Sequence, residues 1–463
     1  MSQTFLIRGA RVLTMDEQMG DLAAADVLVR GGRIEAVGRD LAAPPDATVL
    51  DGTDRLVMPG FVDTHWHMWT SLLRGYTNHT ADRNYIAVRN RLGHLVSPQD
   101  VYACVRLSLV EALNAGFTTV HNWAHNMNTP AHADETVRAH RDVPLRARFS
   151  FGAPHWLRAD QTMDLEEVRR VRDVHFAGDR RLLHLGVAMR GPEFGGSTQD
   201  VWRREWAHAR ALGLPITVHV AEFFDTTQWQ SIARLHADGL LGPDVQLVHG
   251  VHITPEEREM IRQSGSHLSI TPAVEALAGM GVPGISEYIQ AGILLGLSID
   301  VSATSNPADM FGLMRTTMAL ERFRTYQRRG HTATDTTMRH LSLGLTPQKL
   351  LAMATIDGAR CLGLGELTGS VTPGKQADLI VLRLTDPNLS LSAQADPYQL
   401  LVYFGQPANV ESVFVDGRLL KHQGQLQQID AVAAARASSL ALDGLLARAA
   451  SQLPTRRTEQ ETP

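Results

Sequence analysis

Two histidines stand two residues apart where an apolar segment ends. The stretch "VMPGFVDTHWH" carries His65 and His67 with Trp66 between them. Successive side chains of a strand point to opposite faces, so the two imidazoles share one face and Trp66 takes the other, towards outer packing. Histidine is the commonest metal ligand in proteins. An isolated H-x-H pair is nevertheless weak evidence, because two hydrogen-bonded histidines at a strand end explain it as well or better.

Other apolar segments also end in polar residues that could do chemistry. "ITVHVAE" carries His219 and Glu222, "QLVHG" ends near His249, and "LGLSID" ends in Asp300. A carboxylate in an otherwise neutral strand is costly unless it is paired or binds a cation. Each residue alone is best explained as a satisfied polar group, but together they indicate one metal site. Three imidazoles and a carboxylate suit zinc or iron, and such a site with room for water is catalytic.

Alternating strand and helix patterns would bring these strand ends together. Between residues 58 and 366, eight short apolar segments alternate with amphipathic helical patterns such as "SPQDVYACVRLSLVEALNAG", which begins at Ser97 and ends at Gly116. This order predicts a metal-dependent (β/α)8 barrel, an α/β fold whose active site lies at the C-terminal ends of the strands. A Rossmann-type sheet is the alternative, but no G-x-G-x-x-G opens a helix here.

The two chain ends have a different texture, with strand patterns that no helix-length segment separates. "ADVLVRGGRIEAVG" and "VESVFVDGRLLKHQGQL" are typical of hairpins around Gly-Gly and Asp-Gly turns. We therefore expect residues 1–57 and 367–426 to form one small composite β-sandwich domain. Residues 427–463 are expected to form a C-terminal helix and a tail.

Composition narrows the class of protein. The 463 residues include 44 basic and 49 acidic side chains, a net charge of −5 that gives no footprint for nucleic acid or an anionic membrane. No apolar run is long enough to span a membrane, and the N-terminus lacks the pattern of a signal peptide. The only cysteines, Cys104 and Cys361, are far apart, which argues against a disulfide framework or a thiolate zinc site. A cytoplasmic location is expected.

The segments "VMPGFVDTHWH", "HVAE", "LVHG", "SID" and "LAMATIDGARCLGLGELTGSVTPGKQADLIVL" resemble the amidohydrolase superfamily. The most similar branch contains S-adenosylhomocysteine deaminase, guanine deaminase and the triazine hydrolases. The resemblance implies the same barrel with a β-sandwich from both chain ends. It implies four ligands for one divalent metal ion, preferably zinc, with iron possible: His65, His67, His219 and Asp300. Glu222 would be the proton shuttle and His249 would stabilise charge on the substrate, while Asp300 would also accept a proton from water.

The resemblance also implies an activity and its alternatives. We expect a mononuclear metal-dependent hydrolase that deaminates a nitrogen heterocycle and releases ammonia. Hydrolysis of a cyclic amide or imide, or dechlorination of a heteroaromatic ring, is the alternative, because Glu275 in "TPAVE" and the segment "MRGPEF" depart from the family pattern. The third hypothesis is a non-catalytic binding protein. The complete set of metal ligands argues against it. Many members are homo-oligomers, so a dimer or larger assembly is expected.

Loops that follow the barrel strands are expected to contact the small-molecule substrate. The candidate substrate-binding residues are Trp69, Arg74, His125, His155, Arg190, Glu193 and Glu275. Trp123 and Trp156 in the same loops favour a flat, apolar ring as substrate. Arg74 or Arg190 could pair with an anionic substituent, and Asp63 could orient a ligand histidine.

Overall fold

A parallel barrel forms the centre of the molecule. The computed structural model describes residues 3–154, 156–178, 182–193, 196–223, 229–304, 307–329, 344–390 and 394–452. Within these residues, eight parallel strands pair in chain order: β6 (Phe61–Val62), β7 (Phe117–Ala124), β8 (Arg146–Gly152), β9 (Leu183–Met189), β10 (Ile216–Val220), β11 (Val245–His249), β12 (His267–Ile270) and β13 (Leu295–Leu297). The strands are short and almost wholly buried, as expected for a parallel sheet covered on both faces.

Backbone hydrogen bonds connect the first and last strands and so bring the barrel close to a ring. The amide of Thr64 donates to the carbonyl of Leu297 at 3.1 Å, and the amide of His67 donates to the carbonyl of Asp300 at 2.9 Å. The amide of Asp300 returns a bond to His65 at 2.9 Å. The segment after β6 therefore continues the strand path, although only two residues of β6 have regular pairing.

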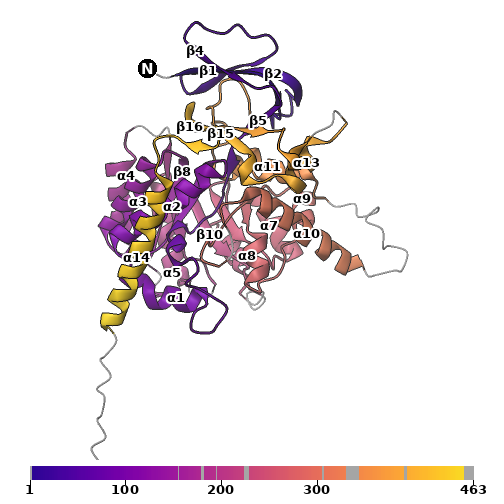
Figure 1. The fold of residues 1–463 in the computed structure, drawn as a ribbon. Coiled ribbons are helices and arrows are strands. Elements are labelled where there is room, and N and C mark those ends of the chain that lie inside the picture. Colours follow the sequence, from indigo (N-terminus) through magenta and orange to yellow (C-terminus); the bar gives the residue numbers. More distant parts are fainter. Residues whose placement is uncertain are drawn as a thin grey trace, which may run out of the picture.

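Helices cover the outside of the barrel and connect its strands (Figure 1). Their bounds are α1 (Tyr85–Leu92), α2 (Pro98–Asn114), α3 (Pro130–Asp142), α4 (Leu165–His175), α5 (Gln199–Ala211), α6 (Ser231–Ala237), α7 (Pro255–Ser264), α8 (Pro272–Leu277), α9 (Ile285–Gln290), α10 (Met310–Arg329), α11 (Pro347–Met353), α12 (Ile356–Cys361), α13 (Pro397–Phe404) and α14 (Ala431–Gln452). Short 3-10 helices are η1 (Met68–Leu73), η2 (Gly93–Leu95), η5 (Pro387–Leu389) and η6 (Pro407–Asn409). The cap predicted for α2 is present, because Ser97 and Asp100 form a capping box.

A second sheet of nine strands joins the two chain ends within the described residues. Its strands are β1 (Thr4–Val12), β2 (Leu22–Arg30), β3 (Arg33–Gly38), β4 (Ala47–Asp51), β5 (Arg55–Pro59), β14 (Leu379–Arg383), β15 (Val410–Val415), β16 (Arg418–His422) and β17 (Gln425–Leu426). The seam is the antiparallel pair of β5 with β14, in which Val57 faces Val381. Figure 1 shows these indigo and yellow strands side by side at one end of the barrel. The predicted barrel and the separate unit from both chain ends are confirmed.

A buried ion pair joins this sheet to the barrel. The guanidinium of Arg146, on β8, lies 2.6 Å from the carboxylate of Asp378, and both side chains are fully buried. Asp378 also accepts a hydrogen bond from the amide of Asp416 at 2.7 Å. Removing one member would leave the other charge buried without compensation, so the pair holds the two units in one arrangement. No helix in the described residues is long and apolar enough to cross a membrane.

Candidate metal and catalytic site

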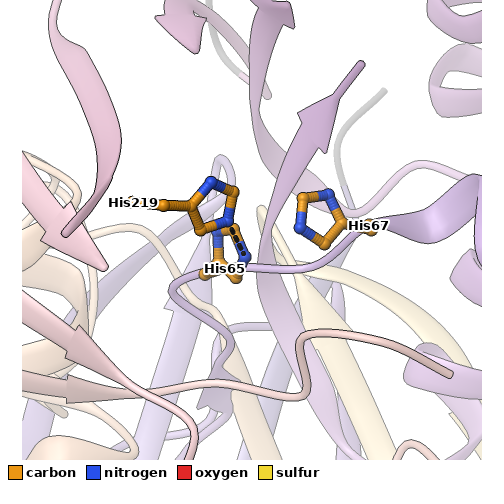
Figure 2. Close-up of side chains that lie close together, drawn as sticks. All are labelled: His65, His67 and His219. Carbon is orange, nitrogen blue, oxygen red and sulfur yellow. Dashed lines mark hydrogen bonds between the residues drawn. The ribbon is translucent and has the colours of Figure 1, made fainter. Parts of the chain in front are cut away.

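Four of the predicted side chains meet at the C-terminal mouth of the barrel. The Nε2 atoms of His65 and His219 lie 3.3 Å apart. Oδ1 of Asp300 lies 3.3 Å from Nε2 of His65 and 3.6 Å from Nε2 of His67. Figure 2 shows the imidazoles of His65 and His67 on one segment, with His219 reaching them from another strand. Residues more than 200 positions apart are thus brought to one point by the order of the strands.

The protonation of these imidazoles suits metal binding. Burial lowers the pKa of each of His65, His67 and His219 well below the ordinary value, so all three are neutral. Nδ1 of His67 lies 3.2 Å from the carbonyl oxygen of Trp123, which can only accept. The proton of His67 therefore sits on Nδ1, and the lone pair of Nε2 faces the cluster. Converging nitrogen lone pairs and a carboxylate oxygen are a donor set that fits a divalent cation such as zinc.

The backbone turns sharply at the strand ends that carry the site. Ala221, His249 and Asp300 have φ values of 49°, 71° and 63°, in the left-handed region that residues other than glycine rarely adopt. The strands cannot continue through this conformation, so they end here, with their last side chains buried at the mouth of the barrel. Such strain clusters at functional sites, where the surrounding structure holds it in place.

Asp63 acts on the backbone that leads into Asp300. Its Oδ1 accepts a hydrogen bond of 2.7 Å from the amide of Ile299. Burial raises the pKa of Asp63 well above the ordinary value. Its carboxylate also has a hydrogen bond with the backbone of His65, so the predicted role of Asp63 in orienting a ligand histidine stays a prediction. Trp66, predicted to take the opposite face from the ligands, is fully buried, and its indole nitrogen donates to the hydroxyl of Ser302 at 2.8 Å.

Glu222 and His249 form a pair beside the ligand cluster. Nε2 of His249 lies 3.3 Å from Oε1 of Glu222, and Nδ1 lies 3.3 Å from Oε1 of Glu275. Burial lowers the pKa of His249, but hydrogen bonds with the two carboxylates outweigh it and raise this pKa well above the ordinary value. Burial raises the pKa of Glu222, while its hydrogen bond with His249 produces a net decrease. His249 is thus a donor to Glu222 on one side and to Glu275 on the other.

Two further glutamates, Glu193 and Glu275, bind groups of the Glu222–His249 pair. Glu193 accepts hydrogen bonds from the amide of Ala221 and the hydroxyl of Ser231, and from the amide of Glu222 at 3.3 Å. Burial raises the pKa of Glu193 to about 7. Glu275 lies in the first turn of α8 and accepts from the amide of Thr271 at 2.9 Å. Glu193 therefore positions the backbone of Glu222, and Glu275 fixes the ring of His249.

A cavity of about 540 Å³ opens above the ligand cluster, a size typical of small-molecule sites. Of the predicted substrate contacts, His125, Arg190 and Glu193 line it, and Trp69, Arg74 and Glu275 lie outside its described lining. His155 lies outside the described residues. Trp69 contacts a lining residue instead, because its indole nitrogen donates to Nε2 of His125 at 2.9 Å. Trp123 lies in the wall itself.

The two arginines proposed to meet an anionic substituent have other partners. Arg74 forms an ion pair of 2.6 Å with Glu111. Arg190 donates to the carbonyls of Leu157 and Arg158 at 3.2 and 3.0 Å. Arg190 also lies 3.6 Å from the buried carboxylate of Glu205. The geometry therefore argues against substrate recognition by the guanidinium of either residue, and Arg190 instead fastens the loop after β8.

One wall of the cavity was missed from sequence. It comes from the loop after η1 and from α1, and its members are Thr77, Asn78, His79, Asn84, Tyr85, Ile86 and Arg89. The asparagine cap of α1 was a usable signal, since Asn84 accepts a hydrogen bond from the amide of Ala87. Tyr85 and Arg89 stand four residues apart, which places them on one helix face. A second part of the lining is mainly apolar: Phe223, Val274, Leu277, Ala278 and Met280.

Comparisons with known proteins give relatives of the whole chain. Residues 56–420 match the amidohydrolase family. The chain is 28% identical to a 5'-deoxyadenosine deaminase of Methanosarcina acetivorans over 96% of this chain and 99% of the relative. It is 30% identical to a 5-methylthioadenosine/S-adenosylhomocysteine deaminase of Desulfitobacterium hafniense over 92% and 95%.

Solved structures share the fold. An adenosine deaminase from Xanthomonas campestris with bound zinc superposes with a TM-score of 0.81 at 22% identity, over 96% of this chain and 98% of that chain. An atrazine chlorohydrolase from Arthrobacter aurescens complexed with zinc also gives 0.81 at 22% identity, over 95% and 100%.

Proposed function

The chain belongs to the amidohydrolase family, as a hydrolase of carbon–nitrogen bonds other than peptide bonds, and from this premise we propose that it deaminates a nitrogen heterocycle. The observation that carries the proposal is Glu222. Its carboxylate lines the cavity, lies beside the ligand cluster and accepts a hydrogen bond from His249. A carboxylate in this position can move a proton between water and a ring nitrogen or a departing amine.

We propose that His65, His67, His219 and Asp300 hold one divalent ion, with zinc preferred because the donors are three neutral imidazoles and one carboxylate. When bound, this ion lowers the pKa of water and so supplies hydroxide near neutral pH. In the overall reaction, the water oxygen bonds to the ring carbon, the bond from that carbon to the amino nitrogen breaks, and ammonia leaves.

The residues of this chain have separate tasks in that reaction. Asp300 accepts a proton from the attacking water, because its carboxylate lies at the strand end beside the histidines. Glu222 carries one proton of the attacking water to the ring nitrogen and then passes the second proton, accepted by Asp300, to the amino group, which leaves as neutral ammonia. The positive charge of His249, held by Glu222 and Glu275, stabilises the negative charge that develops on the oxygen of the attacked carbon. Glu193 and Glu275 keep these two groups in place.

Dechlorination of a heteroaromatic ring is the second candidate, because the fold superposes well on an atrazine chlorohydrolase. Chloride leaves as an anion and needs no proton, whereas an amino group does. The role of Glu222 therefore differs between the two reactions at the leaving-group step.

The test is a panel of aminopurines, aminopyrimidines and aminotriazines, each with its chloro counterpart, assayed for ammonia and chloride release by the zinc-loaded protein. We expect ammonia release by the wild type and a loss of at least about 100-fold in Glu222→Gln. Zinc content should be unchanged in that variant. Glu166→Gln, at an exposed position of α4, is the matched control. Release of chloride without ammonia would contradict deamination and support dechlorination. Full ammonia release by Glu222→Gln would show that Glu222 does not transfer the proton.

A further inference from the structure

We propose that Arg89 recognises an oxyanion on the substrate, so that the heterocycle carries an acidic substituent such as a carboxylate or a phosphate. The inference rests on the proposed function, since it names the substrate class of the same site. It assigns to Arg89 the task that sequence patterns had suggested for Arg74 or Arg190.

Arg89 lies on the cavity-facing side of α1. Both Tyr85 and Arg89 line the cavity, and their spacing of four residues brings their side chains together on the helix surface. The guanidinium carbon of Arg89 lies 5.9 Å from the centre of the Tyr85 ring. The pair forms a continuous wall, with Tyr85 as a flat surface and Arg89 as the charged group next to it.

The positive charge of Arg89 is not neutralised by a carboxylate of the protein. Among the described residues Arg89 forms no ion pair, and its guanidinium bonds neutral groups: the side-chain oxygen of Asn90 at 3.3 and 3.4 Å and the hydroxyl of Tyr85. Arg190, the other arginine of the described lining, is held by carbonyls and Glu205. A guanidinium that faces a cavity presents paired N–H groups that match a carboxylate or phosphate.

The acidic groups of the described lining are occupied elsewhere, so they offer Arg89 no internal partner. They are Glu193, Glu222 and Asp300. Glu193 binds backbone amides, Glu222 binds His249, and Asp300 contacts the ligand histidines. The counter-charge for Arg89 is therefore expected from the substrate.

Three neutral polar side chains beside Arg89 already have partners within the protein. Thr77 donates to the carbonyl of Ala303, and Oδ1 of Asn78 accepts from the hydroxyl of Thr80 at 2.6 Å. Asn84 caps α1. These three side chains thus have little spare capacity for a neutral sugar-like group, while Arg89 adds a positive charge that no carboxylate neutralises.

Arg89 lines the same cavity as the proposed metal ligands His67, His219 and Asp300. A substrate can therefore place its reactive carbon at the ligand cluster and its acidic group at Arg89 within one cavity. The apolar wall with Phe223 and Met280 would cover the face of the ring between them.

The test uses matched pairs of probes on zinc-loaded protein. Aminopyrimidine, aminopurine and aminopteridine are each prepared as a carboxylic acid, a phosphonate and a neutral carboxamide, and binding is measured by calorimetry. We expect at least one acid to bind about 10- to 100-fold more tightly than its carboxamide, the effect of one charge-assisted contact. Arg89→Met should remove the preference and Arg89→Lys should keep part of it. The carboxylate and phosphonate arms identify which oxyanion is preferred.

Arg91→Met is the matched control, because Arg91 lies on the same helix, donates to the hydroxyl of Tyr76 and lies outside the described lining. Arg91→Met should keep the full preference for the acid over the carboxamide, and its melting temperature should equal that of Arg89→Met. If Arg89→Met does not fold, Arg89→Gln is used in its place. Equal binding of acid and carboxamide, no binding by any probe, or a preference that survives in Arg89→Met would overturn the inference. Arg89-dependent binding without ammonia release would support it and contradict the deamination instead.

Discussion

The substitution Glu275→Gln isolates the role of the carboxylate behind His249. Glu275 is fully buried, and its Oε1 lies 3.3 Å from Nδ1 of His249 and 2.9 Å from the amide of Thr271. A glutamine of the same shape can still accept from Thr271 through its amide oxygen, so α8 should keep its start. The substitution removes the negative charge beside Nδ1 of His249. This charge keeps the imidazole protonated, so that its Nε2–H can donate to Glu222.

The magnitude follows from the two kinds of hydrogen bond. A bond that involves a charged group contributes about 1.5–3 kcal/mol, and a neutral one about 0.5–1.5 kcal/mol. The substitution should therefore cost about 1–2 kcal/mol of the stabilisation that His249 gives the transition state. This converts to a decrease in kcat of roughly 5- to 30-fold. KM should change little, because Glu275 lies outside the described lining of the cavity.

The assay is steady-state ammonia release with the best substrate of the panel, together with zinc content and thermal unfolding. Glu257→Gln is the control, because Glu257 is also buried and bonded to backbone amides, but it caps α7 away from the cavity. It should lower the melting temperature and leave kcat unchanged. If Glu275→Gln keeps kcat within about two-fold of the wild type, or changes it only as much as Glu257→Gln does, His249 is not held by Glu275 in the way argued.

Three further predictions address the metal, the backbone and the helices. His67→Ala should lose most of its zinc by elemental analysis, and chelation of the wild type should abolish activity that added zinc restores. At pH 8, above the pKa of about 7 of Glu193, Glu193→Gln should lower kcat about 10-fold at unchanged zinc content, because the amide of Glu222 loses a charged acceptor; an unchanged kcat would refute this. Ser97→Ala should cost about 1 kcal/mol in urea unfolding with no effect on kcat, since it removes the cap of α2; altered kinetics would contradict that separation.

The position of the ligands could be predicted because strand periodicity and barrel topology determine it. His65 and His67 occupy alternate positions, and both point to the cluster even though regular pairing of β6 ends at Val62. His219 and Asp300 join them because the C-terminal ends of all parallel strands in a barrel lie at one mouth. None of these inferences needs the conformation of a loop.

Side-chain partners in loops could not be predicted in the same way. Arg74 and Arg190 follow strands as the predicted contacts should, but their partners, Glu111 and carbonyls near residue 158, are set by where the chain happens to pass. The wall that carries Arg89 lies in a segment with no strand period. Glu275 is an intermediate case, because the four-residue spacing from Thr271 predicts its helical contact but not its contact with His249.

The carboxylates at the mouth of the barrel differ in task because their partners differ. Asp300 faces neutral imidazoles, Glu193 faces backbone amides, and Glu275 faces a buried side of His249. Among the described residues, Glu222 alone combines a place in the cavity lining with a partner, His249, that can exchange a proton with it. We therefore propose that the same group, a carboxylate, serves as a metal ligand, a positioning group or a proton carrier according to its surroundings. This division makes Glu222→Gln the substitution that separates proton transfer from metal binding.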